Sequence, residues 1–255
     1  MWPDVENPPG PCIMTTELTH RAPQIQIGDD NLTVTNDKGY RMAKASHGVV
    51  EGAWYYEGTL VNSQGAVRMG WSQISGDLQG PCGLDHYSYS FRSDPPTRFH
   101  RSIGHSYGSK FQVGDTLGVL IYLPPPTDEQ FEDLLNRRFI LGRDRRYVSF
   151  NYTSTRDPHD PMDSDPASPE EVLPEVPDSA IAYYLNGRPL GTAFTNLYLG
   201  KYYPTVSCYM GAQIRLNFGP DFKYPPPAHW RGVPVESLQM CPPENYLQES
   251  QPAEH

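Results

Sequence analysis

The chain has 255 residues, of which 20% are charged and 12% aromatic, and it carries 27 prolines and 22 glycines. This composition favours many short strands joined by turns over a bundle of packed helices. No stretch approaches the roughly 18 consecutive apolar residues of a membrane-spanning helix, and the four cysteines lack the paired spacing of a zinc site. We therefore expect an all-β protein with no metal, no cofactor and no membrane span.

The net charge of −10 argues against a general nucleic-acid binder, but the charge is unevenly distributed. Between Thr155 and Ala180, eight acidic residues stand against the single Arg156, which leaves −7 in this segment. Six prolines fall between Pro158 and Pro177 in the same segment. The segment has few apolar residues, and their burial cannot offset the entropy that the chain would lose on ordering. Residues 154–180 are therefore predicted to form a disordered loop.

Strand patterns precede this loop. In residues 67–72, Val67, Met69 and Trp71 share one face, while Arg68 lies on the other and is expected to point out of the core. Residues 117–123 (LGVLIYL) are apolar at nearly every position, which is typical of a central strand covered on both faces. Residues 127–140 follow helical spacing, with acids first and arginines last, and are predicted to be a short helical insertion.

After the loop, residues 181–194 predict a hairpin, because Asn186-Gly187 readily supplies the positive φ angles of a two-residue turn. In residues 213–218, Ile214, Leu216 and Phe218 are expected to face inward. The prolines and polar residues at both ends predict flexible tails at 1–17 and 241–255, with one domain at 18–240 between them.

Motifs for catalysis are weak. His100 and His105 are spaced by five, which fits neither one helix face nor one strand face, and no carboxylate signature accompanies them. Ser72 lacks the second glycine of a nucleophile elbow. Glu51 and Glu57 suit a glycosidase pair in principle, but two exposed acids are the more ordinary interpretation. We expect no catalytic residue.

One stretch is locally basic in this acidic chain. Residues 89–110 hold Arg92, Arg98, Arg101 and Lys110 against Asp94, interleaved with tyrosine and phenylalanine. Such a surface can bind carboxylates or phosphates through forked guanidinium groups while aromatic rings exclude water. Taken alone, the stretch is better explained as a solvated basic face, because isolated charge patches are common.

Several segments together resemble a known family. In chain order they are GYRMAKASHGVVEGAWYYEG, VRMGWSQISGDLQGPCGLDHYSYSFRS, RFHRSIGHSYGSKFQVGDTLGVLIYLP, YYLNGRPLGTAF, YYPTVSCY and LNFGPDFKYPP. They are similar to the SPRY domain of the Ash2-like subunit of COMPASS-type (SET/MLL) histone H3 lysine-4 methyltransferase complexes, over residues 21–227 apart from the acidic loop. The resemblance implies a sandwich of two antiparallel sheets, a nuclear location and no enzymatic activity of its own.

The resemblance also implies a partner: a WD-repeat subunit of the retinoblastoma-binding-protein type, whose acidic segment docks on a basic groove. The complex then supports the catalytic SET-domain subunit. The family's groove residues correspond to Tyr40, Arg68, Pro81 and Arg92, and Leu84 stands where the family has tyrosine. Arg98, from the basic stretch, is predicted to join them.

Other family features have weaker counterparts. These 255 residues contain no match to the family's amino-terminal winged-helix and zinc-finger region, so no DNA-binding role is carried over. Residues 232–251 hold only a short apolar pattern before Pro242 and Pro243, which leaves docking to a dumpy-thirty-type dimer open. A second basic cluster, from Arg137 to Arg146, could touch nucleosomal phosphates or neutralise the acidic loop.

Three functions therefore compete at the level of sequence. The first is a non-catalytic scaffold that holds the WD-repeat subunit and thereby stimulates the SET-domain enzyme. The second is a SPRY adaptor that presents substrates to a ubiquitin ligase, which would require a cullin-recruiting box or RING region not found here. The third is a carbohydrate-active enzyme or lectin on a similar sandwich. The acidic-peptide groove favours the first.

Overall fold

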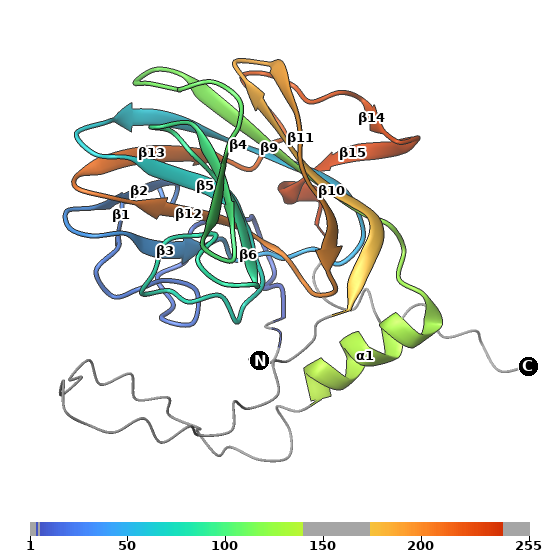
Figure 1. Ribbon diagram of the computed structural model, residues 1–255. Helices are drawn as coiled ribbons and strands as arrows, with labels where there is room; N and C mark the ends of the chain where they lie inside the picture. The colour runs from blue at the N-terminus through green and yellow to red at the C-terminus, as the bar shows by residue number, and fades with distance from the viewer. Residues whose placement is uncertain (1–3, 5, 140–173, 242–255) are drawn as a thin grey trace, which may run out of the picture.

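Two largely antiparallel sheets stack face to face in the computed structural model, which describes residue 4, residues 6–139 and residues 174–241 (Figure 1). The all-β sandwich expected from the sequence is thus confirmed. The larger sheet has the order β1-β2-β13-β4-β9-β10-β11, with β15 beside β4 and β14 beside β15. Its strands are Gln26–Ile27 (β1), Thr33–Asn36 (β2), Gly52–Asn62 (β4), Thr116–Leu123 (β9), Glu175–Leu185 (β10), Arg188–Tyr198 (β11), Ala212–Asn217 (β13), His229–Trp230 (β14) and Val233–Ser237 (β15).

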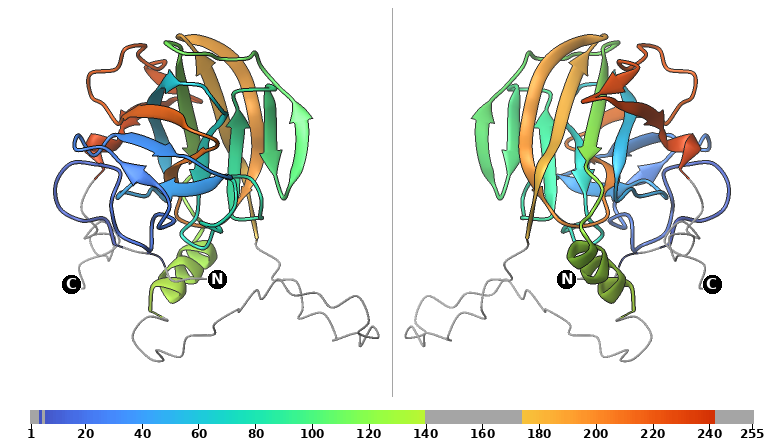
Figure 2. Two further views of the ribbon diagram at one scale, coloured as in Figure 1. Left: turned by 90° about the vertical axis from the view of Figure 1, so that its left-hand side faces the viewer. Right: turned by 90° about the vertical axis from the view of Figure 1, so that its right-hand side faces the viewer.

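The smaller sheet has the order β3-β12-β5-β6-β7-β8. Its strands are Arg41–Lys44 (β3), Val67–Ser72 (β5), Ser88–Arg92 (β6), Thr97–His100 (β7), Ile103–Ser106 (β8) and Tyr203–Cys208 (β12). Figure 2 shows the last strands of this order, in green, at one side of the molecule. β7 and β8 therefore form an outer margin of the sandwich, where side chains on both faces can meet a partner.

The core lies between the sheets. Trp71 and Met69 of β5 are fully buried, as their alternation with Arg68 predicts, and Ile214 and Leu216 of β13 are buried as well. Two tyrosine hydroxyls from the larger sheet donate to main-chain carbonyls of β5: Tyr56 to Gly70 at 2.6 Å and Tyr183 to Met69 at 3.1 Å. These bonds satisfy buried polar groups and fix how the two sheets face each other.

The central strand and the hairpin predicted from the sequence are both confirmed. β9 pairs with β4 on one side and β10 on the other, and every residue except Tyr122 is buried. β10 and β11 are joined by Asn186 and Gly187, whose φ angles of 50° and 78° are those of the expected two-residue turn.

The predicted helical insertion is α1 (Asp128–Phe139), which follows β9 and lies beneath the sandwich in Figure 1. Its first turn carries a reciprocal cap, because the Gln130 amide donates to Thr127 Oγ1 at 3.3 Å and the Thr127 amide donates to Gln130 Oε1 at 3.0 Å. No helix in the described part of the chain is long and apolar enough to cross a membrane. β9 and β10 are neighbours in the sheet although residues 124–174 separate them in sequence.

The predicted boundary of the acidic loop is wrong at its carboxyl end. Residues 175–180, assigned to the disordered loop 154–180, belong to β10 and pair with β11. Val176 and Ala180 are buried there, whereas Glu175 and Asp178 are exposed. The strand passes through a register shift between Val176 and Ala180, where Asp178 has a φ of 64°. Strict alternation is therefore interrupted at this point, and net charge and proline content pointed away from a strand. Residues 154–173 of the predicted loop lie outside the described residues.

The amino-terminal boundary also differs from the prediction. Within the predicted tail 1–17, Cys12 and Met14 are buried, and Met14 forms a β-bridge with Ala45. The Gln239 side chain bonds both the Cys12 amide and the Cys12 carbonyl, each at 3.1 Å. These apolar residues are too few to show a periodicity. Burial and the two hydrogen bonds to Gln239 nevertheless hold the segment against the domain. Of the predicted tail 241–255, only Cys241 is described.

His20 makes the stability of this fold dependent on pH. Its side chain is 2% exposed and packs edge-on against Tyr203. Burial, reinforced by the positive charges of Lys44 and Lys201, lowers the pKa of His20 from its ordinary 6.5 to about 4. The unfolded chain therefore binds a proton in this window that the folded chain does not. Stability should fall as the pH drops from 6.5 towards 4, by on the order of 3 kcal/mol for this group.

Urea denaturation of the parent protein and of His20→Gln at pH 7 and at about pH 4.5 checks this expectation. The loss of unfolding free energy on acidification should be smaller in His20→Gln than in the parent. A matched His105→Gln variant, altered at an exposed position, should keep the parent's pH dependence. Equal pH dependence in the parent and His20→Gln would show that His20 is not responsible.

Candidate functional site

Two arginines lie opposite each other on neighbouring strands of the smaller sheet. Arg68 of β5 and Arg92 of β6 are partners in the antiparallel register, so their side chains leave the sheet on the same face. That face is the one opposite to Met69 and Trp71, which enter the core. The two arginines that the sequence placed in one groove are thus brought together by direct strand pairing.

Aromatic rings surround the Arg68 guanidinium. Its Cζ atom lies 3.8 Å from the ring centre of Phe99 and 4.9 Å from that of Tyr40. The Nη1 group donates to the carbonyl of Cys82 at 3.1 Å. Arg68 is only 8% exposed, and its buried Nε has no hydrogen-bond partner within the described residues. The side chain leaves the core as predicted, but it is covered by rings rather than by solvent.

Arg92 completes the cluster from the neighbouring strand. Its Nε donates to the Pro95 carbonyl at 3.1 Å, and its Nη2 donates to Thr97 Oγ1 at 3.2 Å. The Arg92 Cζ lies 4.8 Å from the centre of the Phe99 ring, which it shares with Arg68. We call Tyr40, Arg68, Arg92 and Phe99 the arginine cluster.

The electrostatics of the arginine cluster are unbalanced. Burial lowers the pKa of Arg68; Tyr40 and Cys82 oppose this shift, and the neighbouring positive charge of Arg92 adds to it. A guanidinium nevertheless stays protonated in proteins, so both charges persist. Neither arginine forms a salt bridge with a carboxylate in the portion of the chain that is described. Like charges placed directly opposite on adjacent strands repel, and an anionic ligand would relieve this repulsion.

Two further aromatic residues were not found from the sequence. Phe99 lies on β7, and Tyr209 follows β12 and stacks on Tyr40 with ring centres 4.9 Å apart. Tyr209 is 39% exposed and extends the aromatic wall beside Arg68. Alternation along residues 97–100 could have singled out Phe99, because Thr97 and Phe99 share one strand face while Arg98 and His100 share the other.

Pro81 and Leu84 lie on the loop that covers this face. The Leu84 amide donates to the Pro81 carbonyl at 3.0 Å, which closes a turn around Cys82. The Leu84 carbonyl accepts from Ser102 Oγ at 2.7 Å, which ties the loop to the turn between β7 and β8. Leu84 is 38% exposed. The loop therefore offers an apolar side chain next to the carbonyl that anchors Arg68.

Arg98 is not part of the arginine cluster, contrary to the prediction. It leaves β7 on the opposite face from Phe99, and its Nη1 donates to the Ala193 carbonyl of β11. The Arg98 Cζ lies 5.6 Å from the centre of the Phe194 ring. Arg98 lines a pocket of about 360 Å³ between β7, β8 and β11. Arg98 was predicted to lie in the groove because its neighbours in sequence are basic. Alternation along β7 places its side chain on the other face of the sheet from Arg68.

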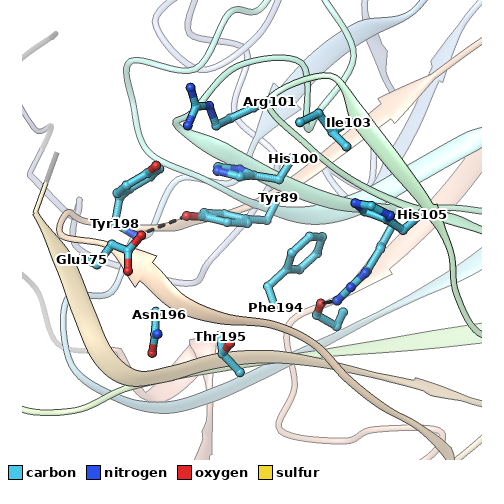
Figure 3. Close-up of a pocket in the computed structure, with 12 residues that line it drawn as sticks. Tyr89, His100, Arg101, Ile103, His105, Glu175, Phe194, Thr195, Asn196 and Tyr198 are labelled. Carbon is cyan, nitrogen blue, oxygen red and sulfur yellow. Dashed lines mark hydrogen bonds between the residues drawn. The ribbon is translucent and has the colours of Figure 1, made fainter. Parts of the chain in front are cut away.

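The residues considered for catalysis have other roles. His100 stacks on Tyr89 with ring centres 4.0 Å apart (Figure 3). The His100 Nδ1 atom lies 2.9 Å from the Ser88 carbonyl. The described residues hold no group of three or more histidine, cysteine or acidic side chains placed to bind a metal. Glu57, expected to be exposed, is 1% exposed.

Both carboxyl oxygens of Glu57 accept hydrogen bonds. Oε1 accepts from the Tyr224 amide at 2.7 Å, and Oε2 accepts from the Lys223 amide at 2.9 Å and from Asn217 Nδ2 at 3.2 Å. These bonds fasten residues 217–224 to β4 and leave neither oxygen directed at an open cleft. The glycosidase pair therefore has no geometric support, and Glu57 is a structural residue.

One known protein family matches part of this chain. A family model described as SPRY domain matches residues 172–221, which include β10, β11 and β12. This part of the chain therefore carries the signature of a SPRY domain. A solved human SPRY domain is similar with a TM-score of 0.47 at 15% identity, covering 78% of this chain and 98% of that chain.

More particularly, the chain is similar to Ash2 subunits, as its motifs indicated. It is 38% identical over 210 residues to the Set1/Ash2 histone methyltransferase complex subunit ASH2 of Drosophila melanogaster, and 35% identical over 217 residues to subunit ash-2 of Caenorhabditis elegans. It is 31% identical over 260 residues to the Set1 complex component ash2 of Schizosaccharomyces pombe. These alignments cover 82%, 82% and 89% of this chain but only 36%, 37% and 38% of the relatives.

Proposed function

We propose that this chain is a non-catalytic subunit of a histone H3 lysine-4 methyltransferase complex. In this proposal the arginine cluster binds an acidic segment of a WD-repeat subunit. The resulting pair of subunits then supports the SET-domain enzyme in the nucleus. The relatives named as subunits of Set1/Ash2 complexes support the assignment to such a complex.

The observation that carries the proposed ligand is the opposition of Arg68 and Arg92 with no carboxylate beside them in the described structure. Carboxylates can satisfy the remaining guanidinium donors in bidentate geometry, which few other peptide groups can do. The rings of Tyr40, Phe99 and Tyr209 exclude water on one side of Arg68, so such a bond gains strength from a lower local dielectric.

The shape of the site suits an extended peptide. The cluster lies on the outer face of a sheet rather than in a closed cavity, and it is bordered by the loop that carries Pro81 and Leu84. Acidic side chains would bind the two arginines, while the peptide backbone would pack against the rings and the exposed Leu84. Leu84 in place of the family's tyrosine removes one hydroxyl from this border.

Capture from nuclear extract tests the proposed assembly. The tagged chain should recover a WD-repeat protein together with a SET-domain protein, and an Arg68→Ala variant with the parent's thermal stability should recover neither. The Arg98→Ala variant, altered on the opposite face of β7, should recover both and is the matched control. Recovery of cullin or RING-type ligase components in place of the methyltransferase would favour the adaptor function and contradict the proposal.

A further inference from the structure

One aromatic ring, that of Phe99, contacts the guanidinium groups of both arginines in the cluster. Phe99 has the Arg68 guanidinium at 3.8 Å and the Arg92 guanidinium at 4.8 Å from its centre. Cations are attracted to an aromatic face by the ring quadrupole, and here a single ring attracts two of them. The ring therefore offsets part of the repulsion between two charges that strand pairing places opposite each other.

Glycines at two neighbouring positions make room for this ring. A Cβ atom at Gly83 would lie 2.7 Å from Phe99 Cβ, and one at Gly104 would lie 2.6 Å from Phe99 Cε1. Both distances are shorter than side chains tolerate, so the Phe99 ring beside Gly104 and the base of its side chain beside Gly83 occupy space that only glycine leaves open. Phe99 is thus held in place by its surroundings and is not a mobile cover on the sheet.

Each guanidinium is fixed a second time by the main chain or a hydroxyl. Arg68 donates to the Cys82 carbonyl, and Arg92 donates to the Pro95 carbonyl and to Thr97 Oγ1. With one anchor at the ring and another at the loop, the distance between the two positive groups is set before any ligand arrives. Such preorganisation lowers the entropic cost of binding a ligand with matching spacing.

The distance between the two charges limits which ligands fit both. Because both Cζ atoms are measured from the same ring centre, at 3.8 and 4.8 Å, they are separated by at most the sum, 8.6 Å. In an extended peptide, side chains two residues apart point to the same side and are about 6.6 to 6.8 Å apart along the chain. Side chains four residues apart start about 13 Å apart along the chain, so their carboxylates would have to converge to reach both guanidinium groups.

We propose that Phe99 is a positioning residue that holds Arg68 and Arg92 as one receptor, and that this receptor selects an extended acidic segment with two carboxylates separated by a single residue. The inference rests on the proposed function, since it specifies the ligand of the same site. Phe99 does not itself bind the carboxylates; it fixes the spacing at which the two arginines meet them.

Two synthetic peptides of identical composition test the spacing. In one, two glutamates are separated by a single residue; in the other, by three residues; serine, threonine and glycine fill the rest. Fluorescence polarisation at about 50 mM salt, where charge screening is weak, should give at least fivefold tighter binding of the closely spaced peptide. A glutamate-rich peptide measured alongside reports on the proposed function independently of spacing.

Two variants test the ring. Phe99→Leu removes the aromatic face, and we expect it to lose the preference between the two peptides while retaining a cooperative thermal transition. Phe99→Tyr keeps the ring and should restore the preference, which a purely structural role at this position would not require. Arg98→Ala, on the other face of β7, should leave the preference unchanged.

The outcomes separate the two proposals. Binding of the glutamate-rich peptide with equal affinity for the two spaced peptides would overturn the paired-carboxylate receptor and leave the proposed function standing. Tighter binding of the widely spaced peptide would indicate a helical ligand and would equally overturn it. No binding of any acidic peptide would reject the proposed function, and the spacing rule with it.

Discussion

Arg68→Ala is expected to weaken binding of a glutamate-rich peptide by at least tenfold in calorimetry. The substitution removes a guanidinium that is 8% exposed and held between the rings of Tyr40 and Phe99. Truncating one partner of a desolvated charge pair costs on the order of 2 to 5 kcal/mol, whereas micromolar binding corresponds to about 8 kcal/mol in all. Losing that much would leave affinities too weak to sustain a complex.

Three comparisons make the Arg68 result interpretable. Arg68→Lys keeps the positive charge but not the forked donors, so its affinity should lie between those of the parent and of Arg68→Ala. Arg98→Ala should change the affinity less than twofold, because Arg98 is directed towards Ala193 on the other face of β7. Thermal unfolding of each variant confirms that the sandwich is intact. An unchanged affinity in folded Arg68→Ala would remove the arginine cluster as the binding site.

Glu57→Gln is expected to lower the free energy of unfolding by about 2 to 4 kcal/mol. The buried carboxyl group accepts three N–H bonds through two oxygens, from Asn217, Lys223 and Tyr224. Glutamine has one accepting oxygen and one donating amide, so either orientation of its side chain places N–H groups against N–H groups. Leaving such buried groups unsatisfied carries the full cost of their desolvation.

Chemical denaturation of Glu57→Gln and Glu175→Gln measures this effect against a matched control. Glu175 also lies on a strand of the larger sheet, but its side chain is exposed, and its substitution should change stability by less than about 0.5 kcal/mol. Equal stabilities of the two variants would mean that the bonds to residues 217–224 contribute little. Since Glu57 is structural, neither variant should lose peptide binding when measured below its unfolding transition.

The sequence predicted the frame of the molecule well because its signals are local. Residues 117–123 are apolar at nearly every position, and Asn186-Gly187 supplies a turn that few other pairs allow. The fold follows once these strands find partners. Local signals could not predict that Arg68 lies beside Arg92, because residues far apart in sequence meet only through the register of β5 and β6. The family motifs supplied that information, whereas periodicity alone would not.

The errors at the site arise from treating a charged stretch as one surface. Arg92, Arg98 and Arg101 are close in sequence, but β7 turns Arg98 away from the cluster and brings Phe99 into it. The composition of a stretch does not distinguish the two faces of a strand. For the same reason, the first residues of β10 were assigned to the acidic, proline-rich loop. Tyr209 could not be anticipated, because only the packing of β3 beside β12 brings it to Tyr40.

The long connection between β9 and β10 gives this domain a tolerant position for changes in length. Tyr122 pairs with Ala180, so the chain that leaves the sheet at the end of β9 returns in the strand beside it. The entropy of closing such an excursion grows only with the logarithm of its length, and each doubling costs about 0.6 kcal/mol. Sequence can therefore be gained or lost here for roughly the cost of one surface substitution. The arginine cluster, on the other sheet, would keep its geometry while this region diversifies.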